Sequence, residues 1–325
     1  MPNSQSHLNT IKRLIVIIPV YNEADNINTL VDAIFSGFEI FNISTNIFLV
    51  DDGSTDTTIN KIQTMSALDS RIDYISFSRN FGKELAIMAG IQECGNDFDA
   101  VAYMDGDGQH TPTDLVRLVI AADDPAVDLV CGVRTDRDYQ TASQRFLAGL
   151  FYYIFRFVGN AKIDKGVGDF NVMKPEVVNS IREMQESHPF MKGIIGWVGF
   201  SKKLIPIEVA PRAGGLAKSS TYKMLKLALG AILSFSSWPL RAWCIIGGIS
   251  AALSVLYLIY IIIMTCLHGT QVPGYASIVV LLLGLGGIQL FSVGILGEYV
   301  ARIYEASKNR PRYIVAKRSS KKYFK

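Results

Sequence analysis

The feature that most limits what this chain can fold into is an uncharged stretch near its C-terminal end. The 56 residues between Arg241 and Glu298 include no Asp, Glu, Lys or Arg. A helix that crosses a bilayer needs about 20 apolar residues, and a Pro-Gly pair at 273–274 divides the stretch. The pattern therefore predicts two transmembrane helices, near residues 242–267 and 275–297. The alternative, a buried helical hairpin of a large soluble protein, fits poorly with an apolar stretch of this length.

Charge divides the chain into an acidic and a basic part. Residues 1–210 contain 18 Lys and Arg against 27 Asp and Glu, whereas residues 211–325 contain 14 against 2. Because basic segments beside spans tend to stay in the cytoplasm, we expect a cytoplasmic C-terminal tail, and two spans return the N-terminal part to the same side. The apolar run at residues 14–20 is too short for the core of a signal peptide, so we expect no export.

The N-terminal part alternates between two kinds of pattern. Apolar or β-rich runs start near Leu14, Ile47, Ile72, Ala100 and Asp128, which is a spacing of 25 to 33 residues. Helical patterns lie between them, for example at 27–35 and 85–91. This spacing is typical of βαβ units, so the sequence predicts an α/β fold with a mainly parallel, Rossmann-like sheet covered by helices on both faces.

Polar groups follow each of the first four predicted strands. They lie at residues 19–23, 51–56, 78–83 and 105–107. Open parallel sheets bind ligands at the carboxyl ends of their strands, so these groups predict a nucleotide site at one edge of the sheet. No GxxxxGK phosphate loop is present, which disfavours ATP hydrolysis.

Two carboxylates mark the end of the fourth predicted strand. Asp105 and Asp107 are separated only by Gly106, so both can face one divalent cation that takes further ligands from substrate phosphates. An ordinary solvated turn is the simpler alternative. A calcium loop fits poorly, because Gln109 and His110 stand where a third Asp or Asn and the turning Gly would be.

The other loops offer groups for a nucleotide. Asp51 and Asp52 can accept hydrogen bonds from ribose hydroxyls or a base N–H, while Asp56 fits equally well as a cap of the following helix. Arg79 and Lys83 offer positive charge to a diphosphate beside a helix N-terminus.

These motifs together resemble a known family. Residues 16–23, 49–56, 78–83 and 105–107 are similar to the motifs of glycosyltransferase family 2, whose members share the GT-A fold. With Gly168-Asp169-Phe170, residues 212–218 and two C-terminal spans, the chain most resembles the polyisoprenyl-phosphate glycosyltransferases, the group of bactoprenol glucosyltransferases and dolichol-phosphate mannose synthases.

The resemblance implies roles for residues at the donor side. Pro19, Tyr21, Glu23 and Asp52 would hold the nucleoside, and Arg79 and Lys83 would lie near the sugar diphosphate. Asp105 and Asp107, with Gln109 as a further candidate, would hold Mg²⁺ or Mn²⁺ against the diphosphate, where the metal acts as a Lewis acid.

On the acceptor side, the resemblance implies that Arg134 and Arg145 bind a lipid phosphate, a role that suits the planar guanidinium. The alternative of surface arginines is weaker for Arg134, which directly follows a predicted strand. Asp169 would orient the acceptor or act as a base. A base is hardly required, because the second pKa of a phosphate monoester is about 6 and the attacking oxygen is largely ionised at neutral pH.

The segment before the first span resembles a basic flap that carries Arg212 and Lys218. It departs from many members at Ala213, where they have an aromatic residue, and at Ala217, where they have a hydroxyl residue, which puts flap closure or donor contact in doubt. An amphipathic pattern at 219–235 suits the membrane interface, or packing against a neighbouring subunit.

We therefore predict a membrane enzyme that transfers a single hexose, with inversion, from a nucleotide sugar to polyprenyl phosphate. The resemblance to the bactoprenol branch favours UDP-glucose and the bacterial inner membrane. We expect a homo-oligomer and no nucleic-acid partner. The alternatives are a processive polysaccharide synthase of the same fold, or a non-catalytic nucleotide-binding membrane scaffold. The expected parts are a GT-A domain at 1–210, a flap and interfacial helix at 211–240, two spans within 241–300, and a basic cytoplasmic tail at 301–325.

Overall fold

The computed structural model describes residues 10–134, 167–184, 186, 189–207, 238–268, 274–308 and 310–319. The chain separates into two compact units. One unit comprises Met1–Ala231 and Pro311–Lys325, and the other comprises Ile232–Arg310. Several predictions fall outside the described residues. They are the roles of Arg145, Arg212 and Lys218, the effect of Ala213 and Ala217, and the amphipathic helix at 219–235.

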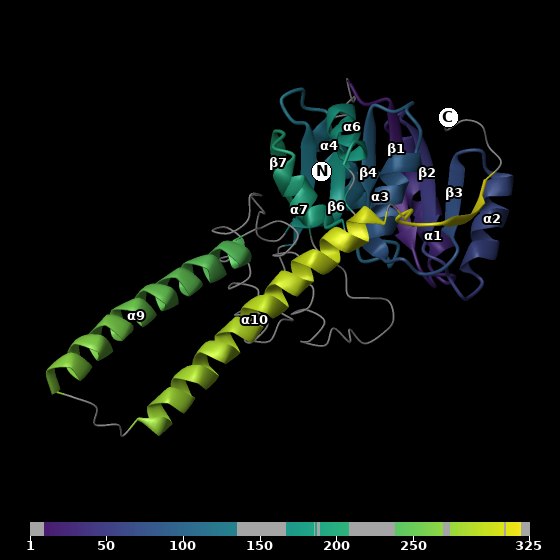
Figure 1. Ribbon diagram of the computed structural model, residues 1–325. Helices are drawn as coiled ribbons and strands as arrows, with labels where there is room; N and C mark the ends of the chain where they lie inside the picture. The colour runs from purple at the N-terminus through teal and green to yellow at the C-terminus, as the bar shows by residue number, and fades with distance from the viewer. Residues whose placement is uncertain are drawn as a thin grey trace. The chain divides into compact units, whose positions relative to one another are not determined.

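The first unit is built on one sheet of eight strands in the order β7-β5-β6-β4-β1-β2-β3-β8 (Figure 1). Four pairs of neighbouring strands run parallel: β4 with β1, β1 with β2, β2 with β3, and β5 with β7. The strand β6 pairs antiparallel with β4 and β5, and β8 pairs antiparallel with β3. The strands are β1 (Arg13–Val20), β2 (Ser44–Asp51), β3 (Ile72–Phe77), β4 (Ala100–Tyr103), β5 (Leu129–Arg134), β6 (Val167–Met173), β7 (Lys202–Ile207) and β8 (Val315–Arg318).

The first five strands start within three residues of the positions predicted from the sequence, so the α/β prediction is confirmed. The sheet is mixed. The parallel core β4-β1-β2-β3 matches the prediction, and the antiparallel strand β6 separates it from the parallel pair β5 and β7.

Helices cover both faces of the sheet. On one face, α1 (Ile27–Glu39) contacts both α2 (Thr58–Leu68) and α4 (Pro112–Ala122). On the other, α3 (Lys83–Glu93) packs on β1 and β2 and contacts α6 (Pro175–Arg182), while α7 (Met191–Trp197) contacts β6. The helical patterns predicted at 27–35 and 85–91 lie within α1 and α3, so these predictions are confirmed.

The strand β1 shows why the sheet is covered on both sides. Its side chains alternate, so that Leu14, Val16 and Ile18 join the core cluster that includes the buried face of α1. Ile17 points to the opposite face, where it lies against Gly90 of α3. A strand buried on both faces is expected to be almost continuously apolar, as Leu14–Ile18 is.

The C-terminal tail differs from the expected basic, cytoplasmic extension in one respect. Residues 315–318 form β8, which pairs antiparallel with β3 at the edge of the sheet (Figure 1, yellow). The sequence Val315-Ala-Lys-Arg318 is too short and too basic to be recognised as a strand, but such features are typical of edge strands.

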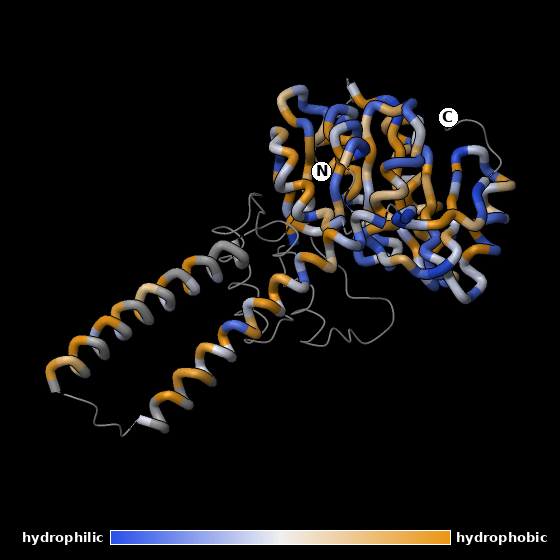
Figure 2. The backbone as a smooth tube through the Cα atoms, in the orientation of Figure 1, coloured by the Kyte–Doolittle hydropathy of each residue, from blue (hydrophilic) through white to orange (hydrophobic). Residues whose placement is uncertain are grey.

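The second unit contains two long helices, α9 (Trp238–His268) and α10 (Tyr275–Ser307), which include both predicted spans. Figure 2 shows that apolar residues run along both helices. Within the part of the chain that the structure describes, one segment, Gly284–Glu305 of α10, is long and apolar enough to cross a membrane by the measure of length and composition. Large apolar side chains on both helices are exposed, for example Leu256 and Leu290.

Candidate functional site

The polar ends of β1, β2 and β4 meet the start of α3 at one pocket of about 190 Å³. The sequence predicted all of its lining residues except Val20 and Gly106. The lining residues are Pro19, Val20, Tyr21, Glu23, Asp52, Lys83, Asp105, Gly106 and Asp107. Its position at the carboxyl ends of parallel strands is the one that this sheet type uses for ligands.

Asp52 is held in place by the loop that leads into α3. Its carboxylate oxygens accept hydrogen bonds from the backbone N–H of Phe81, at 2.7 Å, and of Gly82, at 2.9 Å. Burial raises the pKa of Asp52, and these two hydrogen bonds act in the opposite direction because they favour the charged form. The loop at 78–83 therefore fixes the orientation of a carboxylate in the pocket.

The close approach of two loops requires a glycine next to Asp52. Gly53 has a φ of +69°, and a Cβ there would overlap the backbone carbonyl carbon of Arg79. A residue with a side chain is disfavoured both by the backbone angle and by this contact. Gly53 thus allows the loops after β2 and β3 to pack directly against each other.

Two acidic residues of the second loop have structural partners. Asp51 is almost fully buried and lies outside the pocket lining. It accepts hydrogen bonds from the hydroxyl of Ser76, at 2.6 Å, and the backbone N–H of Ser54, at 3.1 Å. Asp56 accepts from the backbone N–H of Thr58, the first residue of α2, at 2.9 Å. Asp56 precedes the N-cap residue Thr57 and satisfies the first backbone N–H of α2, which is close to the helix-capping role that the sequence left open.

The acidic loop after β4 is fixed at both ends. Gly106 packs against β1, because a Cβ there would lie 2.9 Å from Val20 Cγ1 and 3.1 Å from the carbonyl oxygen of Pro19. At the other end, Thr111 is the N-cap of α4, and its hydroxyl accepts from the backbone N–H of Asp114 and donates to the carboxylate of Asp114. The loop that carries Asp105 and Asp107 is therefore held by packing and by a helix start.

Lys83 joins two acidic residues that are far apart in the sequence. Its ammonium nitrogen lies 2.6 Å from Asp105 Oδ1 and 2.6 Å from Asp169 Oδ2. Burial alone would lower the pKa of Lys83, but the two carboxylates raise it above its usual value, so the group stays charged at neutral pH. The Asp105-Gly106-Asp107 motif and the Gly168-Asp169-Phe170 motif thus share the ammonium group of Lys83.

Asp169 lies at the meeting point of several basic side chains. Lys192 of α7 is 3.9 Å from its Oδ1. Burial acts to raise the pKa of Asp169, but Lys83 and Lys192 more than offset this effect and lower it, with a smaller contribution from Arg134. Arg134, at the end of β5, lies beside the same motif, since its Nε is 4.0 Å from where a Cβ on Gly168 would be. The structure thus brings Arg134 and Asp169 together.

Two predicted donor residues lie near the pocket without lining it. The guanidinium of Arg79 is exposed and stacks over the ring of Phe81 at 4.2 Å. Gln109 donates its backbone N–H to Asp107 Oδ1, at 3.1 Å. The stacking of Arg79 on Phe81 is a cation–π contact within the 78–83 loop, and it keeps the guanidinium close to that loop.

Three residues of the site were missed by the sequence analysis. His110 is buried and stacks on Phe170, and both of its ring nitrogens lack hydrogen-bond partners among the described residues. Its Nε2 lies 3.9 Å from Asp105 Oδ2. Its position three residues after Asp107 is the only sequence signal that marks it. Burial lowers its pKa, so the imidazole is neutral at pH 7.

The other two are Glu84 and Lys192. Glu84 follows Lys83 at the start of α3, and its carboxylate accepts the backbone N–H of Met191, at 2.8 Å, which ties α3 to α7. Burial, together with the charge of Asp169, raises the pKa of Glu84 to about 7. No local pattern marks either residue, because their partners come from distant parts of the chain.

The donor set at the acidic loop fits a hard divalent cation. Asp105 and Asp107 supply carboxylate oxygens to the pocket, and the ammonium of Lys83 already occupies a cation-binding position beside Asp105. Within the described ranges, no group of three or more His, Cys, Asp or Glu side chains gathers in metal-binding geometry. Two protein carboxylates that leave room for phosphate oxygens and water are typical of a Mg²⁺ or Mn²⁺ site.

Comparison with known proteins gives two family matches. Residues 15–182 match glycosyl transferase family 2, and residues 238–303 match a family described as the GtrB C-terminal hairpin. The first match covers β1 through α6, which includes every residue that lines the pocket. The second covers most of α9 and α10.

Relatives match nearly the whole chain. An uncharacterised glycosyltransferase of Synechocystis is 37% identical over 303 residues, which is 93% of this chain and 94% of that protein. A prophage-derived bactoprenol glucosyl transferase of Shigella flexneri is 37% identical over 305 residues, which is 94% of this chain and 98% of that protein. Among solved structures, a mannosyltransferase of Pyrobaculum calidifontis in complex with GDP-Man and Mn²⁺ is 17% identical, covers 94% of this chain and 78% of that chain, and has a TM-score of 0.47.

Proposed function

This chain belongs to glycosyltransferase family 2, and we propose that it transfers one hexose from a nucleotide sugar to the phosphate of a polyprenyl lipid at the cytoplasmic face of a membrane. One observation carries the proposal. Lys83 joins Asp105, in the pocket at the strand ends, to Asp169, which lies beside Arg134. A donor site and a candidate phosphate-binding group are therefore neighbours.

The donor would occupy the pocket. Asp52 is oriented to accept hydrogen bonds from the nucleoside, and Tyr21, which is partly exposed, offers a ring beside it. Lys83 would contact the diphosphate. We propose UDP-glucose as the donor, because the similar Shigella protein is named a bactoprenol glucosyl transferase.

Asp105 and Asp107 would hold Mg²⁺ or Mn²⁺ between them and the diphosphate. The bound metal would supply Lewis-acid neutralisation of the charge that develops on the departing nucleoside diphosphate. The loop around Gly106 and the cap at Thr111 hold both carboxylates in place before the donor binds, so little reorganisation is needed.

The reaction we propose is a direct displacement. An oxygen of the lipid phosphate forms a bond to the anomeric carbon, while the bond from that carbon to the diphosphate oxygen breaks and its electron pair leaves with the nucleoside diphosphate. Because the lipid phosphate is ionised at neutral pH, no side chain has to remove a proton. Arg134 would bind the phosphate, and Asp169, kept ionised by Lys83 and Lys192, would orient these cations. One displacement inverts the anomeric configuration.

Membrane attachment would come from α9 and α10. Both helices expose large apolar side chains along their length, and the two families matched by the chain place a hairpin after the catalytic domain. Two spans would leave the catalytic unit and the tail on the same side, and the basic character of the tail favours the cytoplasmic side.

The proposal is tested with the purified full chain in detergent. The protein is incubated with Mg²⁺ or Mn²⁺, undecaprenyl phosphate and a panel of radiolabelled nucleotide sugars, and the lipid is then extracted. We expect label in the lipid phase from UDP-glucose, only with the metal and only with the lipid phosphate. Label that stays in the aqueous phase for every donor would contradict the proposed function.

A further inference from the structure

The edge strand β8 is bonded to the sheet directly beside the donor loop. The backbone pairs Ile75 with Arg318 and Ser76 with Lys317, and the register shifts between Ser76 and Phe77. Just beyond the paired residues, Ser78 donates its backbone N–H to the carbonyl oxygen of Ile314, at 2.9 Å. Ser78 is the first residue of the 78–83 loop, so the tail satisfies the backbone at the point where this loop leaves β3.

Tyr313 adds a side-chain contact to this backbone pairing. Its ring stacks on the ring of Phe77, with centroids 5.0 Å apart and an interplanar angle of 23°. Its hydroxyl donates to Gln92 Oε1, at 3.3 Å, near the C-terminal end of α3. Burial raises the pKa of Tyr313 to about 12, as is expected for a ring that is packed rather than solvated.

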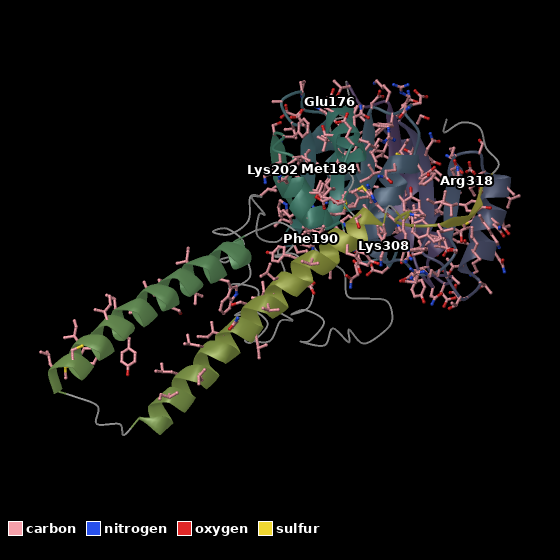
Figure 3. All side chains as sticks on the ribbon, in the orientation of Figure 1. Glu176, Met184, Phe190, Lys202, Lys308 and Arg318 are labelled. Atoms are coloured by element: carbon pink, nitrogen blue, oxygen red, sulfur yellow. The ribbon has the colours of Figure 1, made fainter. Side chains whose placement is uncertain are left out.

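Neighbouring tail residues bind the same unit at other points. Arg312 donates to the carbonyl oxygen of Met184, at 3.3 Å, and Arg318 lies 3.7 Å from the carboxylate of Glu93. Ser319 donates its backbone N–H to Tyr74, at 3.1 Å. Figure 3 shows Arg318 on the strand at this edge of the sheet. Contacts therefore run along the tail from Arg312 to Ser319.

The contacts of Tyr313 continue into the pocket. Phe77 packs edge-to-face against Phe81, with ring centroids 5.6 Å apart and an interplanar angle of 85°. Phe81 in turn carries Arg79 over its ring and donates its backbone N–H to Asp52. Three aromatic rings thus connect the tail to a carboxylate that lines the pocket.

We infer that the tail, residues 311–319, is a structural part of the donor site and that Tyr313 is a positioning residue for the 78–83 loop. Without the tail, Phe77 loses one face of its stack, and Ser78 loses its backbone acceptor. The loop then samples more conformations, and donor binding must restore the order of Phe81 and Gly82 around Asp52. The identity of the ligand, a nucleoside diphosphate sugar, rests on the proposed function.

The effect of Tyr313 is expected on donor binding rather than on the fold. Among the described residues, Tyr313 contacts Phe77 and the end of α3, and its path to the pocket runs through Phe77 and Phe81; β3 is also held along β2, and α3 is packed on β1 and β2. An aromatic stack contributes modestly, so its loss predicts about a threefold to tenfold weaker donor interaction. Asp169 meets the loop at Lys83, which is the first residue of α3 and is therefore also held by the packing of that helix on β1 and β2, so the lipid site is expected to be less affected.

The test uses the full chain in detergent and two measurements. The first is amide hydrogen exchange of residues 78–83 in the ligand-free protein, which needs no substrate. The second is the KM for the donor and for the lipid, together with kcat. Tyr313→Ala is expected to accelerate exchange at Phe81 and Gly82 and to raise the donor KM about threefold to tenfold at unchanged lipid KM. Tyr313→Phe keeps the ring stack, so its exchange rate in the loop and its donor KM are expected to match those of the wild type.

Ile314→Ala is the matched control, because this exposed side chain belongs to the same segment and its backbone carbonyl is retained. If Tyr313→Ala fails to fold, Tyr313→Leu replaces it, since leucine keeps apolar bulk but not the ring stack. Unchanged exchange in the loop, or equal rises in both KM values, would overturn the inference. If Tyr313→Ala accelerates exchange in the loop but the wild-type protein transfers no sugar from any donor, the inference about the tail stands and the proposed function is wrong.

Discussion

At the scale of single residues, the ammonium group of Lys83 connects the two halves of the site. It lies 2.6 Å from carboxylate oxygens of both Asp105 and Asp169, so it balances one negative charge in the pocket and one beside Arg134. The ion pair with Lys83 favours the charged form of Asp169 and so helps to lower the pKa of this buried carboxyl. Positioning and charge neutralisation are the means by which such a site accelerates group transfer.

Asp107 is the residue whose removal tests the metal role most directly. Asp107→Asn keeps the size of the side chain and removes its charge, so we expect sugar transfer to fall at least about 100-fold, because the proposed metal would neutralise charge on the leaving group. Lipid-extracted radiolabel measures the transfer, and circular dichroism measures the fold. Asp32→Asn, at an exposed position of α1, is the control. Transfer by Asp107→Asn at the wild-type rate would exclude the metal role.

Glu84 predicts a dependence of stability on pH. Its pKa in the folded protein is about 7, above the ordinary value of 4.5, so the folded state binds a proton more tightly than the unfolded state between these values. Stability therefore falls as pH rises from about 4.5 to 7, by at most about 3 kcal/mol from this group. Glu84→Gln keeps an acceptor for Met191 and removes the titration.

We expect the melting temperature of the wild type to fall more between pH 5 and pH 7.5 than that of Glu84→Gln. The control is Glu39→Gln, which changes an exposed glutamate of α1 and is expected to follow the wild type. Identical pH profiles for the wild type and Glu84→Gln would show that the pKa of this carboxyl is not raised.

At the scale of elements, the packing of α3 on the sheet decides where Lys83 lies. Gly90 of α3 faces β1 and β2, and a Cβ there would overlap Ile17 Cγ2 and lie 3.3 Å from Val50 Cγ2. The helix can approach the two strands closely only because this position has no side chain. Close approach brings the first turn of α3, with Lys83, to the level of the strand ends.

Gly90→Ala is expected to destabilise the catalytic unit by about 1–3 kcal/mol, because an extra methyl group in a packed core forces neighbouring atoms to move. Thermal unfolding measures the effect. Gly37→Ala is the matched control in another helix, since its Cβ would meet Val116 Cγ2 at an ordinary 3.6 Å. That substitution is expected to be neutral or stabilising by up to about 1 kcal/mol, as alanine favours helix. Equal effects of the two substitutions would contradict this account of α3.

At the scale of the whole molecule, one of the two units is formed by two separate segments of the chain. The catalytic unit is built from residues before the helical hairpin and from the tail that follows it. The hairpin of α9 and α10 is thus inserted into the sequence of the catalytic unit, and β8 closes the edge of the sheet after the hairpin is complete.

Truncation after residue 310 tests this organisation. The shortened chain keeps both long helices, so we expect it to remain in the membrane fraction, whereas its donor KM rises more than that of Tyr313→Ala, because the backbone pairing of β8 is lost as well. Membrane fractionation and steady-state kinetics provide the two measurements. A truncated protein with the wild-type donor KM would show that the tail is dispensable for donor binding.

The sequence by itself determined the α/β class, the first five strands and most of the pocket. Local patterns are sufficient for these features, because an apolar run that ends in Asp-Gly-Asp defines both a buried strand and the chemistry at its end. The polar strand ends pointed to the loops that line the pocket, and Asp105 and Lys83 illustrate this; Pro19, Tyr21 and Glu23 were singled out through the family resemblance.

Only the tertiary structure decided which of these groups share a partner. Asp51 and Asp52 are adjacent in sequence, yet Asp51 accepts a hydrogen bond from Ser76 while Asp52 lines the pocket. The two side chains separate because successive residues at a strand end point to opposite sides of the sheet. Lys192, Glu84 and Tyr313 contact residues far from them in the chain, and a side chain whose partner is distant leaves no local pattern. The periodicity of a sequence fixes its elements, and the packing of those elements fixes the contacts between side chains.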